Sequence, residues 1–143
     1  MDAAMKLTTI MATFLGALVA LPAIGRAEIM GYCKTYAQIS SNAGKCPTCK
    51  ISLSPGPTAG RIVVTANNDW SAEVTVKSGQ TNIASGAGSW APGTNKTYAG
   101  KSFGFDMIRS GNRLAMSMEV IDGKVVRNIL AKFVCSAPET PAI

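Results

Sequence analysis

The motif Cys46-Pro47-Thr48-Cys49 is the part of this 143-residue chain best suited to chemistry. A C-x-x-C pair can exchange thiols when its first cysteine caps a helix that lowers the thiol pKa. Here residues 50–54 alternate like a strand instead, so structural disulfides are favoured over catalytic thiol exchange or metal binding. With Cys33 and Cys135 the chain has four cysteines, which permit three connectivities. We expect one bridge from Cys135 to the N-terminal cysteines and one local bridge within residues 33–49.

Other catalytic groups are scarce. The chain contains no histidine, which removes the commonest general base, the usual zinc ligand and the His-dependent nucleophiles. Asp106 and Glu119 are expected on neighbouring strands, where cross-strand pairing would bring two carboxyls near the separation that glycosidases use. Both residues are equally well explained as ordinary charged side chains on the solvent-exposed faces of their strands. We therefore expect no enzyme, no cofactor and no metal site.

A binding constellation is expected in residues 78–102, a segment rich in Gly, Ser, Thr and Asn. Its residues are Trp90, Tyr98, Asn82, Asn95, Lys96 and Lys101. An exposed indole beside amides and lysines suits stacking on a sugar face or anchoring in a partner's pocket. The alternative is that Trp90 and Tyr98 cover the open end of the core. Residues 95–97 also form a glycosylation sequon, which matters only in a eukaryotic host.

The central elements are predicted by alternation of apolar and polar residues. Residues 61–66 and 70–77 alternate on either side of an Asn-Asn-Asp turn, which predicts a β-hairpin. A short strand is expected at 50–54 before a Pro- and Gly-rich turn. Within the polar segment we expect only short strands, at 82–84 and around 97–99.

The C-terminal third predicts a meander. Residues 103–107 and 114–120 alternate cleanly, and Asp122-Gly123 is a strong two-residue hairpin signal. The last strand, 124–135, places Arg127 on the same face as apolar residues, so we expect a bulge near Arg127 and Asn128. In total, six to eight short strands with almost no helical period predict an all-β fold, a small antiparallel β-sandwich or barrel.

The N-terminus has the order of a secretory signal. Lys6 precedes an apolar run to Ile24, and small residues precede the expected cut after Ala27. We therefore divide the chain into a signal peptide (1–27), one disulfide-linked β domain (28–135) and a flexible tail (136–143). The expected location is secreted or periplasmic, with no membrane span after cleavage.

The chain is basic, with a formal net charge of +6. The lysines and arginines are scattered, which favours an anionic partner slightly and argues against a nucleic-acid partner. Parts of the chain loosely resemble small periplasmic β domains that inhibit lysozymes or proteases, but no motif matches residue for residue. No site residue is therefore taken from them.

These observations predict an exported, non-enzymatic binding protein, inhibitor-like or effector-like. Its expected partner is a protein or a glycan that contacts the 78–102 region. Two alternatives stay open. The first is a structural subunit of a surface assembly of the pilus or adhesin type, and the second is a thiol oxidoreductase that uses the C-x-x-C motif.

Overall fold

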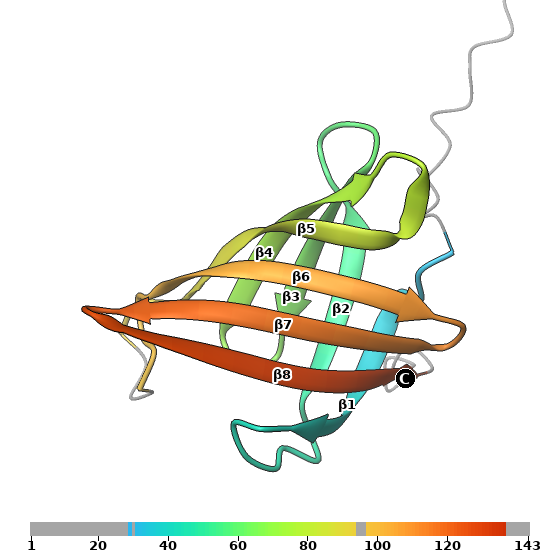
Figure 1. Cartoon of the computed structure of the whole chain (residues 1–143). Coiled ribbons are helices and arrows are strands. Elements are labelled where there is room, and N and C mark those ends of the chain that lie inside the picture. Colours follow the sequence, from blue (N-terminus) through green and yellow to red (C-terminus); the bar gives the residue numbers. More distant parts are fainter. Residues whose placement is uncertain (1–28, 30, 94–96, 137–143) are drawn as a thin grey trace, which may run out of the picture.

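The fold is a closed antiparallel barrel of eight strands (Figure 1). The computed structural model describes residues 29, 31–93 and 97–136. Each strand pairs with the next along the chain, and β8 pairs with β1 to close the barrel. The strands are β1 (Thr35–Ser41), β2 (Lys50–Pro55), β3 (Arg61–Ala66), β4 (Trp70–Lys77), β5 (Gln80–Trp90), β6 (Ser102–Ser110), β7 (Arg113–Asp122) and β8 (Val125–Cys135). The all-β prediction is confirmed, in its barrel form.

The predicted central hairpin is confirmed as β3 and β4. Ile62 pairs with Val74 and Val64 with Ala72, which places all four side chains in the core. The turn between the strands contains Asp69 at φ 75°, a left-handed conformation that Asp tolerates better than most residues. Local alternation and turn chemistry therefore agree with the tertiary structure here.

The polar segment 78–102 contains more strand than the sequence predicts. Residues 80–90 form the long strand β5, which pairs with β4 on one side and β6 on the other. Within its sequence, QTNIASGAGSW, residues 84–89 are all Ala, Ser or Gly and have no branched or aromatic side chain typical of strands. Pairing with β4 and β6 on either side holds this part extended. The strand expected at 82–84 lies inside β5, whereas 97–99 forms part of a turn.

The predicted bulge in the last strand is also wrong. The β7–β8 register runs without a shift through Glu119 opposite Asn128 and Val120 opposite Arg127. Arg127 stays on the same side of the strand as the inward-facing residues. Its side chain is nevertheless exposed to solvent, because this hairpin extends beyond the barrel. Register shifts occur instead between Gln38 and Ser40, where β1 pairs with β8, and at the β4–β5 turn.

The predicted pattern of one long-range and one local disulfide is confirmed, and the structure identifies the partners. Cys33–Cys135 joins the segment before β1 to the end of β8, across the seam that closes the barrel. Cys46–Cys49 closes a short loop between β1 and β2. Two such bridges are typical of proteins from oxidising compartments.

The barrel interior is filled by inward-facing residues of all eight strands. The largest fully buried side chains are Tyr36, Phe105, Phe133, Ile51, Ile62, Met107, Leu114, Met118, Val64, Val74 and Val120. In the described part of the chain, no helix is long and apolar enough to cross a membrane. The expected signal (1–27) and residues 137–143 of the expected tail lie outside the described residues.

Candidate functional site at the barrel mouth

A cavity of about 430 Å³ opens at one end of the barrel. This end, which we call the mouth, carries the β1–β2 loop (42–49), the β3–β4 turn (67–69), the β5–β6 loop (91–101) and the β7–β8 turn (123–124). Eight strands enclose an interior just wide enough for side chains or one small ligand. The volume also lies within the usual range for small-molecule sites.

One wall of the cavity is aromatic. Trp70 begins β4 and Trp90 ends β5, and the two residues are paired in register. Phe103 contacts both rings edge-on, at centroid distances of 5.8 Å and 4.8 Å. The β5–β6 loop returns Tyr98 onto Trp90, with the ring centroids 5.0 Å apart. Each ring of this wall therefore packs against at least one other ring.

A second part of the cavity lining is aliphatic and comes from the last two strands. Met116 and Met118 of β7 pair with Ala131 and Ile129 of β8, and all four residues line the cavity. These side chains are buried and carry no hydrogen-bonding group that would need a partner. The inner cavity therefore suits an apolar or aromatic molecule rather than an ion.

Two asparagines fasten the β1–β2 loop to the strands beside it. Asn42 accepts a hydrogen bond from the backbone N–H of Leu130 and donates one to the Asn128 carbonyl. Asn67 accepts from the Lys50 N–H and donates to the Thr48 carbonyl. Each side-chain amide thus forms the same pair of hydrogen bonds that the backbone of a neighbouring strand would form, and these bonds hold this part of the rim in place.

The Cys46–Cys49 bridge lies on the same rim, and both cysteines line the cavity. Cys46 is half-buried and Cys49 is buried. The Cys49 N–H donates to the Cys46 carbonyl, so the bridge closes a tight turn that runs directly into β2. No helix follows the motif, so the feature that lowers thiol pKa in many redox C-x-x-C sites is missing here.

The charges at the mouth are mainly positive. Lys45 is the only charged side chain among the described residues that line the cavity. Lys101 forms an ion pair with Asp122, which joins the β5–β6 loop to the β7–β8 hairpin. The hydrogen bond from Lys101 and its charge lower the pKa of the Asp122 carboxyl. The mouth therefore presents a polar rim with one cation over an apolar interior.

The structure divides the predicted binding constellation. Trp90 is only 6% exposed and Tyr98 is half-buried, so the alternative in which they cover the open end of the core is correct. The expected exposure of the Trp90 indole is wrong because β5 directs this side chain into the barrel. Lys101 is at the mouth, held by its ion pair. Asn82 lies near the other end of β5, roughly 26 Å away along the strand.

Two predicted residues, Asn95 and Lys96, lie outside the described residues, and they are the first two residues of the sequon. Sequence reasoning missed the contribution of β7 and β8 to the site. Alternation over residues 114–120 predicts that Met116 and Met118 face inward, but it does not show that they border a cavity.

The expected carboxylate pair is not formed. Asp106 pairs with Ser117, while Glu119 lies opposite Gly104, so the two carboxylates are diagonal neighbours on the outer wall. Asp106 instead accepts a hydrogen bond of 2.6 Å from the Ser85 hydroxyl. Both residues are exposed and distant from the cavity lining, as strand-surface charges are.

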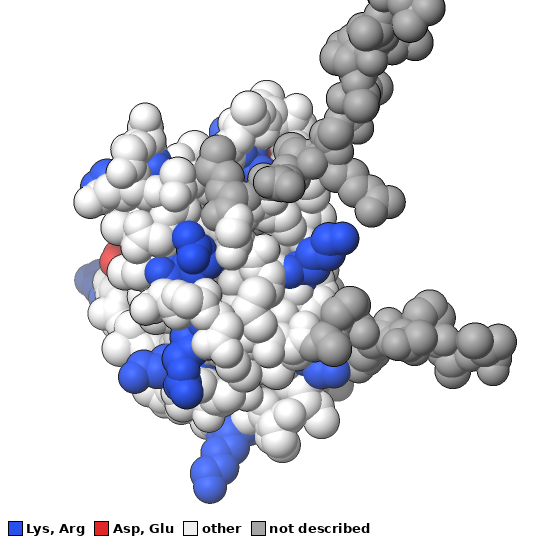
Figure 2. Space-filling model, turned by 90° about the vertical axis from the view of Figure 1, so that its right-hand side faces the viewer, with Lys and Arg blue, Asp and Glu red and all other residues white. Residues whose placement is uncertain are grey.

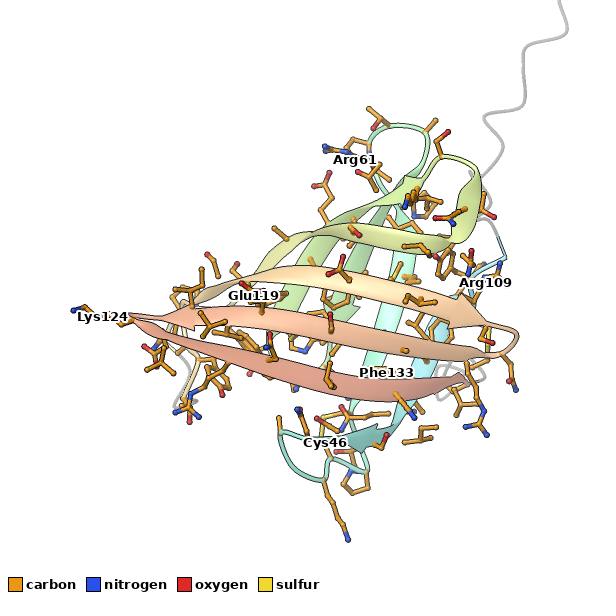
Figure 3. The ribbon with its side chains drawn as sticks, in the orientation of Figure 1. Cys46, Arg61, Arg109, Glu119, Lys124 and Phe133 are labelled. Carbon is orange, nitrogen blue, oxygen red and sulfur yellow. A yellow bond between two sulfur atoms is a disulfide. The ribbon has the colours of Figure 1, made fainter. Side chains whose placement is uncertain are left out.

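The opposite end of the barrel carries packed tyrosine side chains. Tyr32 and Tyr36 pack there, and the Arg109 guanidinium lies 5.4 Å from the centre of the Tyr32 ring. Burial raises the pKa of both tyrosine hydroxyls, although the nearby Arg109 acts in the opposite direction. Figure 3 shows Cys46 and Arg109 on opposite ends of the ribbon.

Comparison with family models, curated proteins and solved structures found no match.

Proposed function

We propose that this protein is an exported, non-enzymatic binding protein, secreted or periplasmic, whose ligand site is the mouth of the barrel. The observation that carries the proposal is the cavity, with an aromatic and aliphatic lining below a polar rim. Such a site fits a small amphipathic molecule. Its apolar or aromatic part enters the barrel, and its polar or anionic group stays near Lys45.

The two tryptophans of the chain provide the assay. Trp70 and Trp90 both line the cavity, so any ligand that enters it changes the intrinsic fluorescence. The first probe is 1-anilinonaphthalene-8-sulfonate, which combines an aromatic body with one anionic group; dodecanoate is the second. We expect a saturable change with each probe.

A matched pair of variants locates the site. Ala131 is buried and lines the cavity, whereas Ala115 is exposed on the neighbouring strand and does not line it. Ala131→Leu fills part of the cavity and should weaken probe binding about tenfold or more, because overlap with packed atoms is costly. Ala115→Leu should leave binding unchanged. Equal binding by the two variants, or no saturable signal from the native protein, would refute the site.

The rim is tested separately by reversing its charge. Lys45→Glu changes an exposed side chain and should not affect folding. This substitution should weaken binding of the two anionic probes and leave binding of the neutral dodecanol unchanged. An equal effect on anionic and neutral probes would remove Lys45 from the proposal while leaving the cavity as the site.

A protein or glycan partner held only by the rim is the alternative occupant. Such a partner would tolerate Ala131→Leu, because a filled cavity leaves the rim residues in place. Retained capture of a partner by this variant, together with absent probe binding, would favour that alternative. The same comparison therefore separates the two kinds of ligand.

A second candidate function, thiol exchange, is supported by one observation. Cys46 and Cys49 are bridged to each other rather than to the other cysteines, so they form a closed C-x-x-C pair beside an apolar cavity. Reduction of insulin in the presence of dithiothreitol tests it. An enhanced rate that Cys46→Ser abolishes would favour an oxidoreductase, and a rate equal to dithiothreitol alone would exclude that activity.

The surface-assembly alternative has no structural support. Strand addition requires an unpaired sheet edge. In the described barrel every strand is paired on both sides.

A further inference from the structure

The β7–β8 hairpin continues past the wall of the barrel. The β6–β7 register ends at Phe103 opposite Val120. The β1–β8 register ends at Ser41 opposite Ala131. Residues 121–127, which we call the hairpin tip, therefore have no strand beside them except each other's and the end of β7. Figure 1 shows the tip as a two-stranded ribbon that projects from the barrel at the mouth.

The hairpin tip exposes large apolar side chains on both of its faces. Ile121 is 62% exposed, and Val125 and Val126 are each 53% exposed. Ile121 and Val126 are paired and share one face, whereas Val125 lies on the other face because successive strand residues alternate. Neither face is covered, since the ribbon at this point has no barrel interior behind it.

The hairpin tip also carries positive charge. Lys124 and Arg127 are exposed, and no ion pair joins either side chain to a described carboxylate. The tip has one carboxylate, Asp122, which is paired with Lys101 of the neighbouring loop. Figure 3 shows Lys124 at the point of the hairpin, beyond the barrel. Apolar and cationic side chains are thus mixed in one short projecting ribbon.

Charge alone does not distinguish this end from the end opposite the mouth. Figure 2 looks onto that opposite end, where Lys and Arg side chains are also spread. The exposed cations there include Lys34, Lys77 and Arg113. The two ends differ in their apolar side chains. Near the opposite end the exposed Ile108 lies in the barrel wall, between Ile83 of β5 and Ala115 of β7, rather than on a projection.

We propose that the hairpin tip docks this protein on an anionic lipid surface. The apolar side chains enter the boundary between headgroups and acyl chains, and Lys124 and Arg127 stay at the level of the lipid phosphates. Exposed apolar patches mark surfaces that bind membranes or other proteins. Lipid is favoured over a pocket in a partner protein because it surrounds both faces of the ribbon and because its headgroups match the charge of the two cations.

This inference does not rest on the proposed ligand site. Docking by the tip turns the mouth towards the lipid, since the tip belongs to the mouth, but it requires no ligand in the cavity. The two proposals therefore stand or fall by different experiments.

A matched pair of variants tests the apolar contribution. Ile121→Ser/Val126→Ser removes two exposed apolar side chains from the tip. Ile108→Ser/Leu130→Ser removes two from the barrel wall, where they are 48% and 56% exposed. Co-sedimentation with vesicles of phosphatidylglycerol and phosphatidylcholine measures the partition coefficient. We expect the tip variant to bind at least tenfold more weakly, because two apolar side chains lose their contact with lipid. The wall variant should bind within about twofold of the native protein.

A second pair tests the cations at constant loss of charge. Lys124→Gln/Arg127→Gln should bind the same vesicles roughly tenfold more weakly, because both cations lie at the lipid surface. Lys77→Gln/Arg113→Gln removes two cations from the opposite end and should bind within about twofold of the native protein, because distant charges are screened. The difference between the two variants should disappear with vesicles of phosphatidylcholine alone.

Insertion is measured directly with an added tryptophan. The native Trp70 and Trp90 are buried and provide a constant background. Brominated phosphatidylcholine in the anionic vesicles should quench the indole of Val126→Trp and shift its emission to shorter wavelength. The indole of Ile108→Trp, on the barrel wall, should show neither change.

Four results would overturn the proposal. Absence of vesicle binding by the native protein at low salt would exclude lipid and leave the tip for a pocket in a partner protein. Equal weakening by the two serine variants would show that the tip is not the apolar contact, and equal weakening by the two glutamine variants would show that only net charge matters. Loss of vesicle binding by Ala131→Leu would show that lipid enters the cavity instead. Unchanged circular dichroism and urea midpoints verify that each variant is folded.

Discussion

Substitution of Gly88 by alanine tests the arrangement that forms the cavity. Gly88 lies on β5, opposite Ala72 of β4 and Phe103 of β6. A Cβ atom at this position would lie 2.1 Å from the Ser71 carbonyl oxygen, 2.8 Å from the Ala72 Cα and 2.7 Å from the Phe103 ring. All three separations are shorter than a Cβ atom tolerates. Two of the contacts are with backbone, which cannot move aside as a flexible side chain does.

The cost follows from these contacts. An extra methylene in a packed core costs about 1–3 kcal/mol, and more where backbone must shift. Ala72 and Phe103 would both have to move, and Phe103 holds the two tryptophans of the cavity wall in edge contact. Gly→Ala also stabilises by about 0.4–1 kcal/mol through the unfolded chain. We therefore expect Gly88→Ala to lower the free energy of unfolding by about 3 kcal/mol, a large part of the stability of a small domain.

Gly104→Ala is the matched control. Gly104 lies on the adjacent strand β6, and a Cβ atom there would approach no atom closer than 4.0 Å. Neither glycine has a positive φ angle, so the two substitutions differ in space rather than in backbone conformation. Gly104→Ala should leave stability within about 1 kcal/mol of the native value.

Urea unfolding followed by circular dichroism measures both variants under non-reducing conditions. The expected difference between them corresponds to a melting-temperature difference of roughly 10–20 °C. If Gly88→Ala is as stable as Gly104→Ala, then β4 does not approach β5 as described. The register that pairs Trp70 with Trp90, and the aromatic wall that depends on it, would then be wrong.

Two further predictions concern the bridges and alkaline pH. Removing the Cys33–Cys135 bridge with a double alanine variant should cost about 5 kcal/mol, against about 2 kcal/mol for Cys46–Cys49, because the first spans 102 residues and the second three; equal losses in thermal unfolding would contradict this ranking. Burial raises the pKa of Tyr36 above its ordinary value of 10.0. The folded protein then keeps a proton that the unfolded chain releases, so stability is full below about pH 10 and falls as the pH rises towards the folded-state pKa. Urea midpoints between pH 8 and 11.5 should show this fall, and Tyr36→Phe should reduce it; an identical fall in that variant would assign the effect to other groups.

Much of the barrel was predictable because its strands alternate. The inward and outward residues of β4, β6 and β7 follow from a two-residue period, and turn residues such as Asp69 and Gly123 mark where the chain reverses. Alternation identified only residues 82–84 of β5, because residues 84–89 are all Ala, Ser or Gly and have no apolar and polar pattern. There the backbone is extended because strands on both sides supply its hydrogen bonds.

The candidate site was predictable only in part. Trp90 and Tyr98 were identified as binding or end-capping residues, and the structure places both at the mouth. Their neighbours Met116 and Ile129 come from strands distant in the sequence, and no local pattern relates them to the tryptophans. Asn82 and Trp90 belong to one Gly- and Ser-rich segment of the sequence, but they lie near opposite ends of the extended strand β5.

The sequence by itself determined that the fold is all-β and which way most side chains face, because both depend on local periodicity. It predicted one long-range and one local disulfide, but the structure decided which cysteines pair. Only the tertiary structure decided that β8 pairs with β1 and closes the barrel. Closure also defines which loops and turns lie together at each end of the molecule. In a closed barrel, the order and direction of the strands determine where each residue lies in space. Closure brings aromatic and aliphatic residues that are distant in the sequence together around one cavity. The C-x-x-C motif, the strongest chemical signal in the chain, is thereby placed on the rim of that cavity.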